Sequence, residues 1–518
     1  MCVMNLAHMN TDINQLQDKV SEQAEEIERL NYQVEYLQSQ LKLHLLRQYS
    51  KKSEQIPSNQ LSLFDDEEMP DEDTEEPEEE KVTYTRKKRG HRKPIDEDLE
   101  RITKTHELCG DDLKCNCGVE LDPIGTVTST RYEYIPARAV AIEDIQTKYA
   151  CKTGCRETVK LAPKPDQILP KTNASPGLLA QIVTSKFEDS CPTHRQETQF
   201  ARCGLHLKRN TMSRWIIQLS DKLVVLTNMF EDIIREGPYM QIDETPVQVL
   251  NEQGRIPTAK SYFWGRKGGP PRKEVILFRY DPSRSSKVAI GLTQDYAGYI
   301  QCDGYSAYTC LEKGGDITLL GCWAHARRKF KEAFKVQVGK GGLQKETAKQ
   351  ALRYIKKLYK IESKTKLLDN DARYNARQEQ AVPILKEFEE WLLKHQNVAL
   401  PKSPLGKAIR YTLNQWPRLI RYCNHGFLQI DNNAQEREIR PIAIGKKNWL
   451  FASTPEGAHA NARLYSIIGT SKAHGHDTYA YLKHIFKELP LADTLEKVEA
   501  LLPWNVDPET VKALARDI

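Results

Sequence analysis

Three carboxylates that are far apart in the sequence have the chemistry to hold divalent metal ions together. Asp243 lies in a strand-like run within Gln-Ile-Asp-Glu-Thr, and Asp303 ends a later strand-like run within Gln-Cys-Asp-Gly-Tyr. Glu436 lies in the helical stretch 434–440. Mg²⁺ prefers oxygen ligands and keeps several waters, so two or three carboxylates with phosphate oxygens suffice to bind it. Two such ions about 4 Å apart can activate the attacking oxygen and stabilise the leaving oxygen in phosphodiester displacement.

Each acid also has an ordinary structural interpretation. An aspartate at a strand end is often only a turn residue. Asn433 and Glu436 have the spacing of a helix capping box, and Asp431 could itself cap the helix. The metal site is favoured because the acids occur in a joint order, with two on strands and one on a helix. Asp431 and Glu438 remain alternatives for the third acid.

Basic side chains surround Glu436 in the sequence. If the helix 434–440 ends at Pro441, Glu436 and Arg440 share one face. Guanidinium groups beside a metal-binding acid suit a site that grips phosphates while one of them is cut. We therefore expect DNA contacts from Arg437 and Arg440 and from further basic residues: His325, Arg327, Arg328, Lys329, Lys446 and Lys447.

Several nearby side chains have two interpretations. His325, in the basic run CWAHARRKF, could contact the scissile phosphate or simply pack within its helix. Trp323 and Trp449 could stack on an unpaired base, although packing in the hydrophobic core is the favoured interpretation. His474 and His476 could suggest a metal site, but two histidines alone are weak evidence.

The strands that carry the two aspartates belong to a predicted mixed sheet. The expected strands are, in chain order, 239–250, 261–269, 274–282, 298–308 and the first part of 317–334, with a helix at 285–296. Three antiparallel strands followed by alternating helix and strand give an α/β layout. In a sheet of this order the strands of Asp243 and Asp303 can be neighbours, which would bring both acids to one edge.

Five cysteines are concentrated between Cys109 and Cys155. The pairs Cys115/Cys117 and Cys151/Cys155 would supply four thiolates, which suit tetrahedral zinc. Their C-x-C and C-x3-C spacings differ from the common C-x2-C, and Cys109 could replace a member of the first pair. In a long cytosolic chain clustered cysteines favour metal binding over disulfides. The alternative is a set of unrelated core cysteines.

Residues 1–48 repeat every seven residues, as a coiled coil does. β-branched residues in one row and leucines in the other favour two parallel strands. Gln23 and His44 interrupt the second row, and Gln23 could fix the register. The two rows are Leu6, Ile13, Val20, Ile27, Val34 and Leu41, and Met9, Leu16, Leu30 and Leu37. We expect self-association, with an amphipathic helix packed on its own domain as the alternative.

The region from 174 to 236 has a helical pattern that outlines a helix-turn-helix. A first helix ends near Gly204, and a basic second helix follows it. Three residues of this second helix are the expected DNA contacts: Lys208, Arg209 and Arg214. Helical hairpins with glycine turns also occur in proteins that never bind DNA, so the outline alone is a weak signal.

The charge distribution favours a polyanionic partner. The net charge is +5, but residues 65–80 hold twelve acidic and no basic residues, so the rest of the chain carries +17. This acidic tract lies in an aromatic-poor segment, 49–98, that we expect to be a disordered linker. A purely solubilising linker is the alternative. The sequence has no apolar run of transmembrane length and no signal-peptide pattern, which predicts a cytosolic protein without a membrane partner.

Four stretches of the chain closely resemble one family. IDET, CDGY, CWAHARRKF and DNNAQEREIRPIAIGKKNWLF resemble the DDE transposases of insertion-sequence family 66, the TnpC type, in the same order. The resemblance covers nearly the whole chain, including the tail LLPWNVDPE. It implies an RNase H-like catalytic domain with a helical insertion before its last acid. It also implies that Asp243, Asp303 and Glu436 form the catalytic triad and hold two Mg²⁺ or Mn²⁺ ions.

The predicted organisation has eight segments. They are a coiled coil (1–48), the linker (49–98), a zinc-binding segment (99–165), a helical DNA-binding region (166–236), the first part of the catalytic domain (237–338), a helical insertion (339–425), the last part with the third acid (426–485) and a C-terminal tail (486–518).

Together with the resemblance, these segments predict a cytoplasmic, nucleoid-associated DNA transposase. It would bind the terminal inverted repeats of an insertion sequence, cleave there and join the ends to target DNA as a dimer or larger assembly. Small accessory proteins of the same element are further candidate partners. Two alternatives remain: a dimeric DNA-binding regulator without catalysis, and a nuclease that cuts but does not join.

Overall fold

The structure is a computed structural model that describes residues 139–150, 159–164, 166–336, 343–397 and 399–515, together with Gln23, Val34 and Leu37. These three isolated residues are helical and exposed. The rest of the predicted coiled coil, the predicted linker and the expected zinc ligands lie outside the described residues: Cys109, Cys115, Cys117, Cys151 and Cys155. The chain divides into two units, and all of the second, residues 54–138, also lies outside them.

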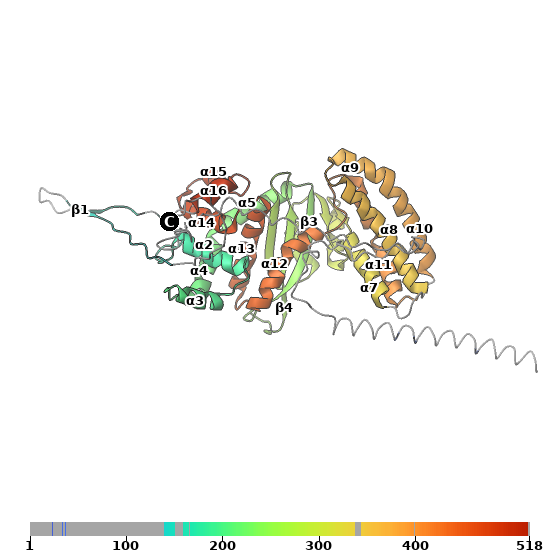
Figure 1. Cartoon of the computed structure of the whole chain (residues 1–518), viewed down its shortest axis with the longest axis horizontal. Coiled ribbons are helices and arrows are strands. Elements are labelled where there is room, and N and C mark those ends of the chain that lie inside the picture. The colour runs from blue at the N-terminus through green and yellow to red at the C-terminus, as the bar shows by residue number, and fades with distance from the viewer. Residues whose placement is uncertain are drawn as a thin grey trace, which may run out of the picture. The chain divides into compact units, whose positions relative to one another are not determined.

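A five-stranded mixed sheet is the centre of the described fold (Figure 1). Its strand order is β5-β4-β3-β6-β7, in which β3, β4 and β5 pair antiparallel and β3, β6 and β7 pair parallel. The strands are β3 (Tyr239–Gln248), β4 (Lys260–Gly268), β5 (Val275–Asp281), β6 (Gly298–Gln301) and β7 (Ile317–Leu320). The predicted mixed sheet is confirmed, but the fourth expected strand, 298–308, is shorter than predicted: β6 ends at Gln301 and a 3₁₀ helix covers Ser306–Gly314. A separate hairpin pairs β1 (Lys148–Ala150) with β2 (Val159–Leu161).

Helices cover both faces of the sheet. The side chain of Gln435, on α12 (Asn433–Trp449), lies so close to Gly265 on β4 that a Cβ there would collide with it. The next residue, Arg266, points to the opposite face and pairs with Glu231 on α5 (Val224–Glu236). Successive strand residues alternate between faces, so α12 and α5 lie on opposite sides of β4.

The edge strand β5 is covered by a helix instead of another strand. On α13 (Pro455–Ala473) the Thr470 hydroxyl accepts from the Ile276 N–H and donates to its carbonyl, both at 3.0 Å. The Ser466 hydroxyl accepts from the Phe278 N–H at 2.7 Å. These two hydroxyls, one helical turn apart, satisfy backbone groups that an open sheet edge leaves unpaired.

We expect Thr470→Val to destabilise the protein by about 1–3 kcal/mol, because it leaves the buried Ile276 N–H without a partner. Thr412→Val is the matched control, since that buried hydroxyl only donates to the Ala408 carbonyl of its own helix. Urea unfolding of the purified variants measures both effects. An equal or smaller cost for Thr470→Val would contradict the proposed edge cap.

The helices before and after the sheet share its hydrophobic core. One apolar cluster runs from Ile168 to Leu502 and includes Trp215 and Phe230 together with the β-strands. The helices that contribute to it are α2 (Pro176–Phe187), α3 (Thr193–Arg202), α4 (Arg209–Lys222), α5, α13, α14 (Thr478–Glu488) and α15 (Leu495–Glu499), together with α6 (Ser286–Leu292) between β5 and β6. The last described helix is α16 (Pro508–Leu514). The region 166–236 therefore packs as part of the sheet domain, and part of the predicted tail is folded onto it.

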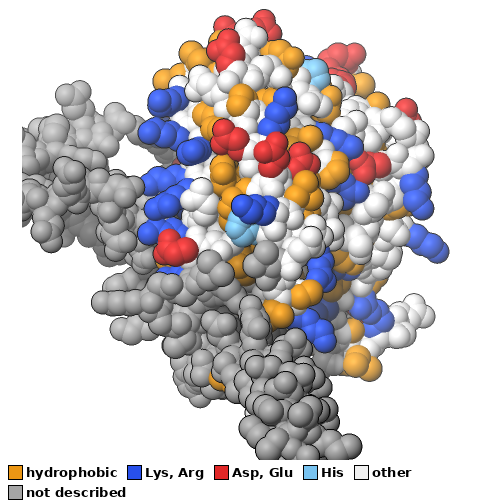
Figure 2. Space-filling model, turned by 90° about the vertical axis from the view of Figure 1, so that its right-hand side faces the viewer, with side chains coloured by type: hydrophobic (Ala, Val, Ile, Leu, Met, Phe, Trp, Pro, Cys, Tyr) orange, Lys and Arg blue, Asp and Glu red, His pale blue; other side chains and the backbone are white. Residues whose placement is uncertain are grey.

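A second apolar core lies in the helical segment between β7 and α12. It joins α7 (Trp323–Val336), α8 (Leu343–Thr365), α10 (Val382–Gln396) and α11 (Pro404–Leu419), with the short α9 (Asn370–Ala376) beside them. The buried Arg377 closes this bundle by binding Glu362 and the carbonyls of Tyr422 and Leu428. Figure 2 shows basic side chains interspersed with acidic and apolar ones on this side of the molecule. No described helix is both long and apolar enough to cross a bilayer.

Candidate active site

The two aspartates lie at matching distances along neighbouring parallel strands: Asp243 is on β3, whereas Asp303 lies two residues beyond the end of β6 at Gln301. β3 and β6 pair with Gln241 opposite Gln301, and the Gln241 side-chain amide donates to the Gln301 side-chain oxygen at 2.9 Å. Asp243 and Asp303 each lie two residues farther along. Since side chains alternate along a strand, Asp243 belongs to the face on which the glutamines meet. Asp303 is close enough for its charge to raise the pKa of Asp243. The prediction that their strands are neighbours is confirmed.

Asp243 lies in a strongly negative environment. The pKa of its carboxyl is raised to about 8, chiefly by burial, then by the charge of Glu244 and, to a smaller extent, by the charges of Asp303 and Glu436. A hydrogen bond from the Glu244 N–H to Asp243 Oδ1, at 2.9 Å, acts in the opposite direction. Asp303 and Glu436 are therefore close enough to Asp243 for their charges to affect its ionisation.

Glu436 lies where α12 meets α7. Its Oε2 accepts from Arg328 at 3.3 Å, and its Oε1 lies 3.7 Å from His325 Nε2. Oε1 is buried and has no hydrogen-bond partner among the described residues. Burial, with the positive charge of Arg328, lowers the pKa of His325, so the imidazole is neutral at pH 7. The third acid thus faces two of the predicted basic residues.

The two alternative third acids are engaged elsewhere. Asp431 accepts from the Asn433 N–H at 3.0 Å and from the Tyr359 hydroxyl at 2.8 Å, so its carboxylate is occupied at the start of α12. Glu438 pairs with Lys267 at 3.1 Å. Glu436 is therefore the best candidate of the three.

Two details of the predicted helix are wrong. Asn433 is the first residue of α12 and Asn432 is its N-cap, so Asn433 and Glu436 do not form a capping box. Pro441 lies inside α12, which continues to Trp449. Proline removes one helical hydrogen bond, but packing of the later turns compensates: Ile442 and Gly445 are buried, and Gly445 fits against Tyr465.

Buried glutamines tie α12 to the strands, and the sequence-based prediction missed them. Gln241 donates to the Asp431 carbonyl at 2.9 Å and accepts from the Gln435 N–H at 3.1 Å. Gln301 donates to the carbonyls of Gln429 and Gly321, at 2.9 and 3.1 Å. The same Gln-x-Asp spacing before both aspartates was the available signal. These bonds fix the start of α12, and hence Glu436, relative to both strands.

A second missed group joins the segments after the aspartates. The buried Glu244 side chain accepts from Arg284 Nε at 2.6 Å and from the Tyr308 hydroxyl. The Arg284 guanidinium lies 3.9 Å from the ring centre of Tyr305, whose N–H donates to Asp303 at 2.8 Å. The residue after one aspartate is thereby linked to the loop after the other.

The acids fit a divalent cation. They offer the hard oxygen ligands that Mg²⁺ prefers, and they concentrate negative charge around Asp243. In the described part of the chain, no three His, Cys, Asp or Glu side chains lie close enough together to hold one ion. Two carboxylates with phosphate oxygens would nevertheless suffice, and the unpartnered Glu436 Oε1 is available as a further ligand.

The predicted DNA-binding residues fall into different environments. Gly204, at φ +80°, makes the turn between α3 and α4, and three exposed residues follow it: Lys208, Arg209 and Arg214. Of the remaining residues, Arg437 and Lys447 are exposed, Arg327 and Arg440 are half-buried, Lys329 lies over the Tyr411 ring, and Lys446 donates to the Pro246 carbonyl at 2.7 Å.

The tryptophans and the histidine pair have structural roles. Trp323 is buried and its indole donates to the Leu419 carbonyl at 2.9 Å, while Trp449 packs against the main core. His474 and His476 bond to the carbonyls of Glu274 and Pro503. The favoured core interpretation of the tryptophans is confirmed, and neither histidine points to a metal site.

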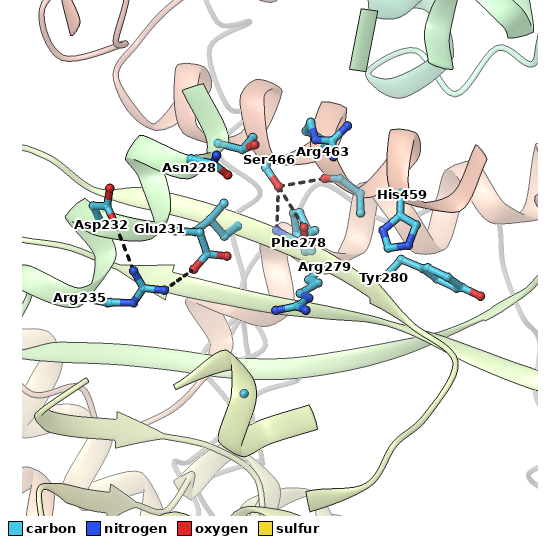
Figure 3. A pocket seen from close by; sticks show the side chains of 14 residues that line it. Asn228, Glu231, Asp232, Arg235, Phe278, Arg279, Tyr280, His459, Arg463 and Ser466 are labelled. Atoms are coloured by element: carbon cyan, nitrogen blue, oxygen red, sulfur yellow. Dashed lines mark hydrogen bonds and ion pairs between the residues drawn. The ribbon is translucent and has the colours of Figure 1, made fainter. Parts of the chain in front are cut away.

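A polar pocket of about 450 Å³ lies between α5, β5 and α13 (Figure 3). It is lined by basic and acidic side chains, among them Arg235, Arg279, Arg463, Glu231 and Asp232. Glu231 also pairs with Arg266, which points away from α12. The pocket is therefore on the sheet face opposite the three acids and is not part of their site.

Family models match most of the chain. The model described as "Transposase IS66 family" matches residues 171–460, which hold all three acids. The IS66 C-terminal element matches 466–504, and the zinc-finger binding domain of transposase IS66 matches 112–153. A model described as "Transposase C of IS166 homeodomain" matches 36–103, which overlaps the segment predicted as a linker.

Two curated relatives from Sinorhizobium fredii (strain NBRC 101917 / NGR234) cover similar extents. "Uncharacterized protein y4jD" is 30% identical over 401 residues, which are 75% of this chain and 77% of that protein. "Uncharacterized protein y4qI" is 30% identical over 426 residues, 80% of this chain and 77% of that protein. With more than half of its length matched by the family model, the chain belongs to the IS66 transposase family.

Proposed function

We propose that this family member is an active DNA transposase that cleaves DNA at the ends of an insertion sequence and joins them to a target. The observation that carries the proposal is that Asp243 lies on β3 and Asp303 follows the paired strand β6, with both Asp303 and Glu436 electrostatically coupled to Asp243. The order of three antiparallel and two parallel strands supports an RNase H-like assignment of the catalytic domain.

The three acids have distinct surroundings that suit their roles. Two Mg²⁺ or Mn²⁺ ions, held by Asp243, Asp303 and Glu436, would supply the stabilisation of attacking and leaving oxygens. Arg328 pairs with Glu436 and is 46% exposed, so an incoming DNA phosphate can compete for its guanidinium. Release of Arg328 to the phosphate would free Glu436 to turn toward the aspartates.

The remaining parts would bind DNA and pair subunits. Arg214 lies on the side of α4 away from the buried Met212, Trp215 and Leu219, and the exposed Lys208 and Arg209 lie at the start of the helix, so all three are available to a DNA groove. We assign the cysteine cluster to structural zinc and residues 1–48 to a coiled coil that joins two chains.

The test is a strand-transfer reaction with the full chain, Mg²⁺ or Mn²⁺, and a duplex that ends in the inverted repeat flanking the gene. Joined products support a transposase. Cleavage without joining would favour a nuclease. Binding without cleavage would favour a DNA-binding regulator, which is the second candidate because α4 is basic.

We expect the affinity for this duplex to fall steeply with salt, because each neutralised phosphate contributes about −0.9 to the slope of log K against log salt. Replacing Lys208, Arg209 and Arg214 with glutamine should make the slope shallower by the contribution of about three phosphate contacts. Lys497→Gln is the control, since this exposed lysine pairs with Asp493. Fluorescence anisotropy across a salt series measures the slopes, and unchanged slopes would exclude α4 from the interface.

A further inference from the structure

The chain forms a strained turn directly after α12. Leu450 has φ 66° and ψ −55°, and the Phe451 N–H donates to the Trp449 carbonyl at 2.8 Å, which is a γ-turn that L-residues rarely adopt. The turn is anchored on both sides. The Leu450 N–H donates to the Lys446 carbonyl at 2.8 Å, and the Ala452 N–H donates to the Gln248 carbonyl of β3 at 3.0 Å.

The strained turn holds large apolar side chains in solvent. Leu450 is 61% exposed and Phe451 is 40% exposed, whereas the preceding Trp449 packs against the main core. Ile444, on the last turns of α12, is 41% exposed. Burial within the described fold therefore does not explain the strained backbone. Strain that the surroundings maintain is often found at sites with a function.

The position of the turn relative to Glu436 fits a DNA partner. Leu450 follows Glu436 by fourteen residues, so at 1.5 Å per residue α12 separates them by about 21 Å. This distance corresponds to about six base pairs of B-DNA at 3.4 Å each. The exposed Lys447 and the nearby Lys446 supply positive charge beside the apolar tip. A duplex bound at the acids and following α12 would meet this tip.

We propose that Leu450 and Phe451 form a wedge that enters the bound duplex and unstacks one base step. The proposal rests on the proposed function, because it assumes that DNA lies along α12. Apolar side chains inserted between base steps are an established way in which proteins kink DNA, and the energy of unstacking is recovered from new contacts. Side chains that separate stacked bases must keep their position when the bases press against them, and the hydrogen bonds on both sides of the γ-turn provide that rigidity.

The test uses the full chain in EDTA and the inverted-repeat duplex with 2-aminopurine at single positions, scanned over about six base pairs on either side of the scissile phosphate. The fluorescence of 2-aminopurine rises when a neighbouring base unstacks. We expect a rise at one position with the unchanged protein and none with Phe451→Ala. Phe451→Tyr should retain the rise, because the ring is preserved.

Leu450→Gly separates a wedge from a structural role. Glycine adopts positive φ without strain, so this variant should keep or raise its melting temperature while it loses the fluorescence rise and about tenfold of its joined product. Leu495→Ala is the control for Leu450→Ala. Both leucines are 61% exposed, but only Leu450 belongs to the proposed wedge. The proposal is overturned if the unchanged protein binds the duplex without a rise at any position, or if Leu450→Gly and Phe451→Ala keep the rise. Failure of the proposed function would appear separately: the 2-aminopurine fluorescence would rise in EDTA, but no DNA would be cleaved in Mg²⁺.

Discussion

Glu436→Gln is expected to reduce DNA cleavage and joining by at least about a thousandfold, the scale on which lost charge stabilisation slows a reaction. The glutamine keeps the size of the side chain and can still contact Arg328, but it cannot contribute a negative charge to a metal site. Affinity for the duplex should change little, because the basic residues of α4 and α12 are untouched. Gel assays of cleaved and joined products, with anisotropy for binding, measure the two effects.

Glu438→Gln is the matched control for this variant. Glu438 lies two residues farther along α12 and pairs with Lys267, so its loss should leave catalysis within a few-fold of normal. If Glu438→Gln were inactive and Glu436→Gln active, the third acid would move to Glu438. If both were active, the third ligand would have to come from another residue.

The sequence predicted the sheet and the adjacency of its aspartates because both depend on local signals. Hairpin spacing identified β3, β4 and β5, and the strand-like run around Asp243 placed that acid on β3, whereas β6 ends two residues before Asp303. The parallel pairing of β3 with β6 then follows from the order of the elements. Each of these signals spans a few residues and needs no knowledge of distant contacts.

The missed features depend on contacts between distant segments. The bonds of Gln241 to the Asp431 carbonyl and of Gln435 back to Gln241 join residues about 190 positions apart. The passage of α12 through Pro441 depends on packing against α13, which outweighs the local preference for a helix end. In the sequence Thr470 looks like an ordinary polar helix residue. Its hydroxyl is seen to cap the sheet edge only when β5 lies beside the helix.

The glutamine bonds also explain why the three acids form one electrostatic unit. β3 and β6 hold the aspartates by backbone pairing, but α12 is joined to them mainly through Gln241 and Asn432, whose side chain donates to the Ile242 carbonyl at 3.1 Å. Glu436 is one turn farther along the same helix. Its position relative to Asp243 is therefore set by side-chain bonds and not by the sheet ladder.

Asp243→Asn is expected to abolish catalysis and, in EDTA, to stabilise the protein increasingly as the pH rises from about 4 to about 8. In the folded protein the pKa of Asp243 is raised from its ordinary value of 3.8 to about 8, chiefly by burial and the charge of Glu244. Between these values the folded state holds a proton that the unfolded state has released, so the unfolding free energy falls as pH rises. The upper limit is about 1.4 kcal/mol per pH unit, and asparagine removes this dependence.

Urea unfolding at several pH values measures the difference between Asp243→Asn and the unchanged protein. Exposed Asp316 provides the control variant, Asp316→Asn, which should show no such divergence. Added Mg²⁺ should restore the stability of the unchanged protein near pH 8 but not that of Asp243→Asn, because a bound cation favours the ionised carboxylate. A stability difference that is the same at every pH would mean that Asp243 is not crowded by Glu244, Asp303 and Glu436. The charge cluster on which metal binding depends would then be absent.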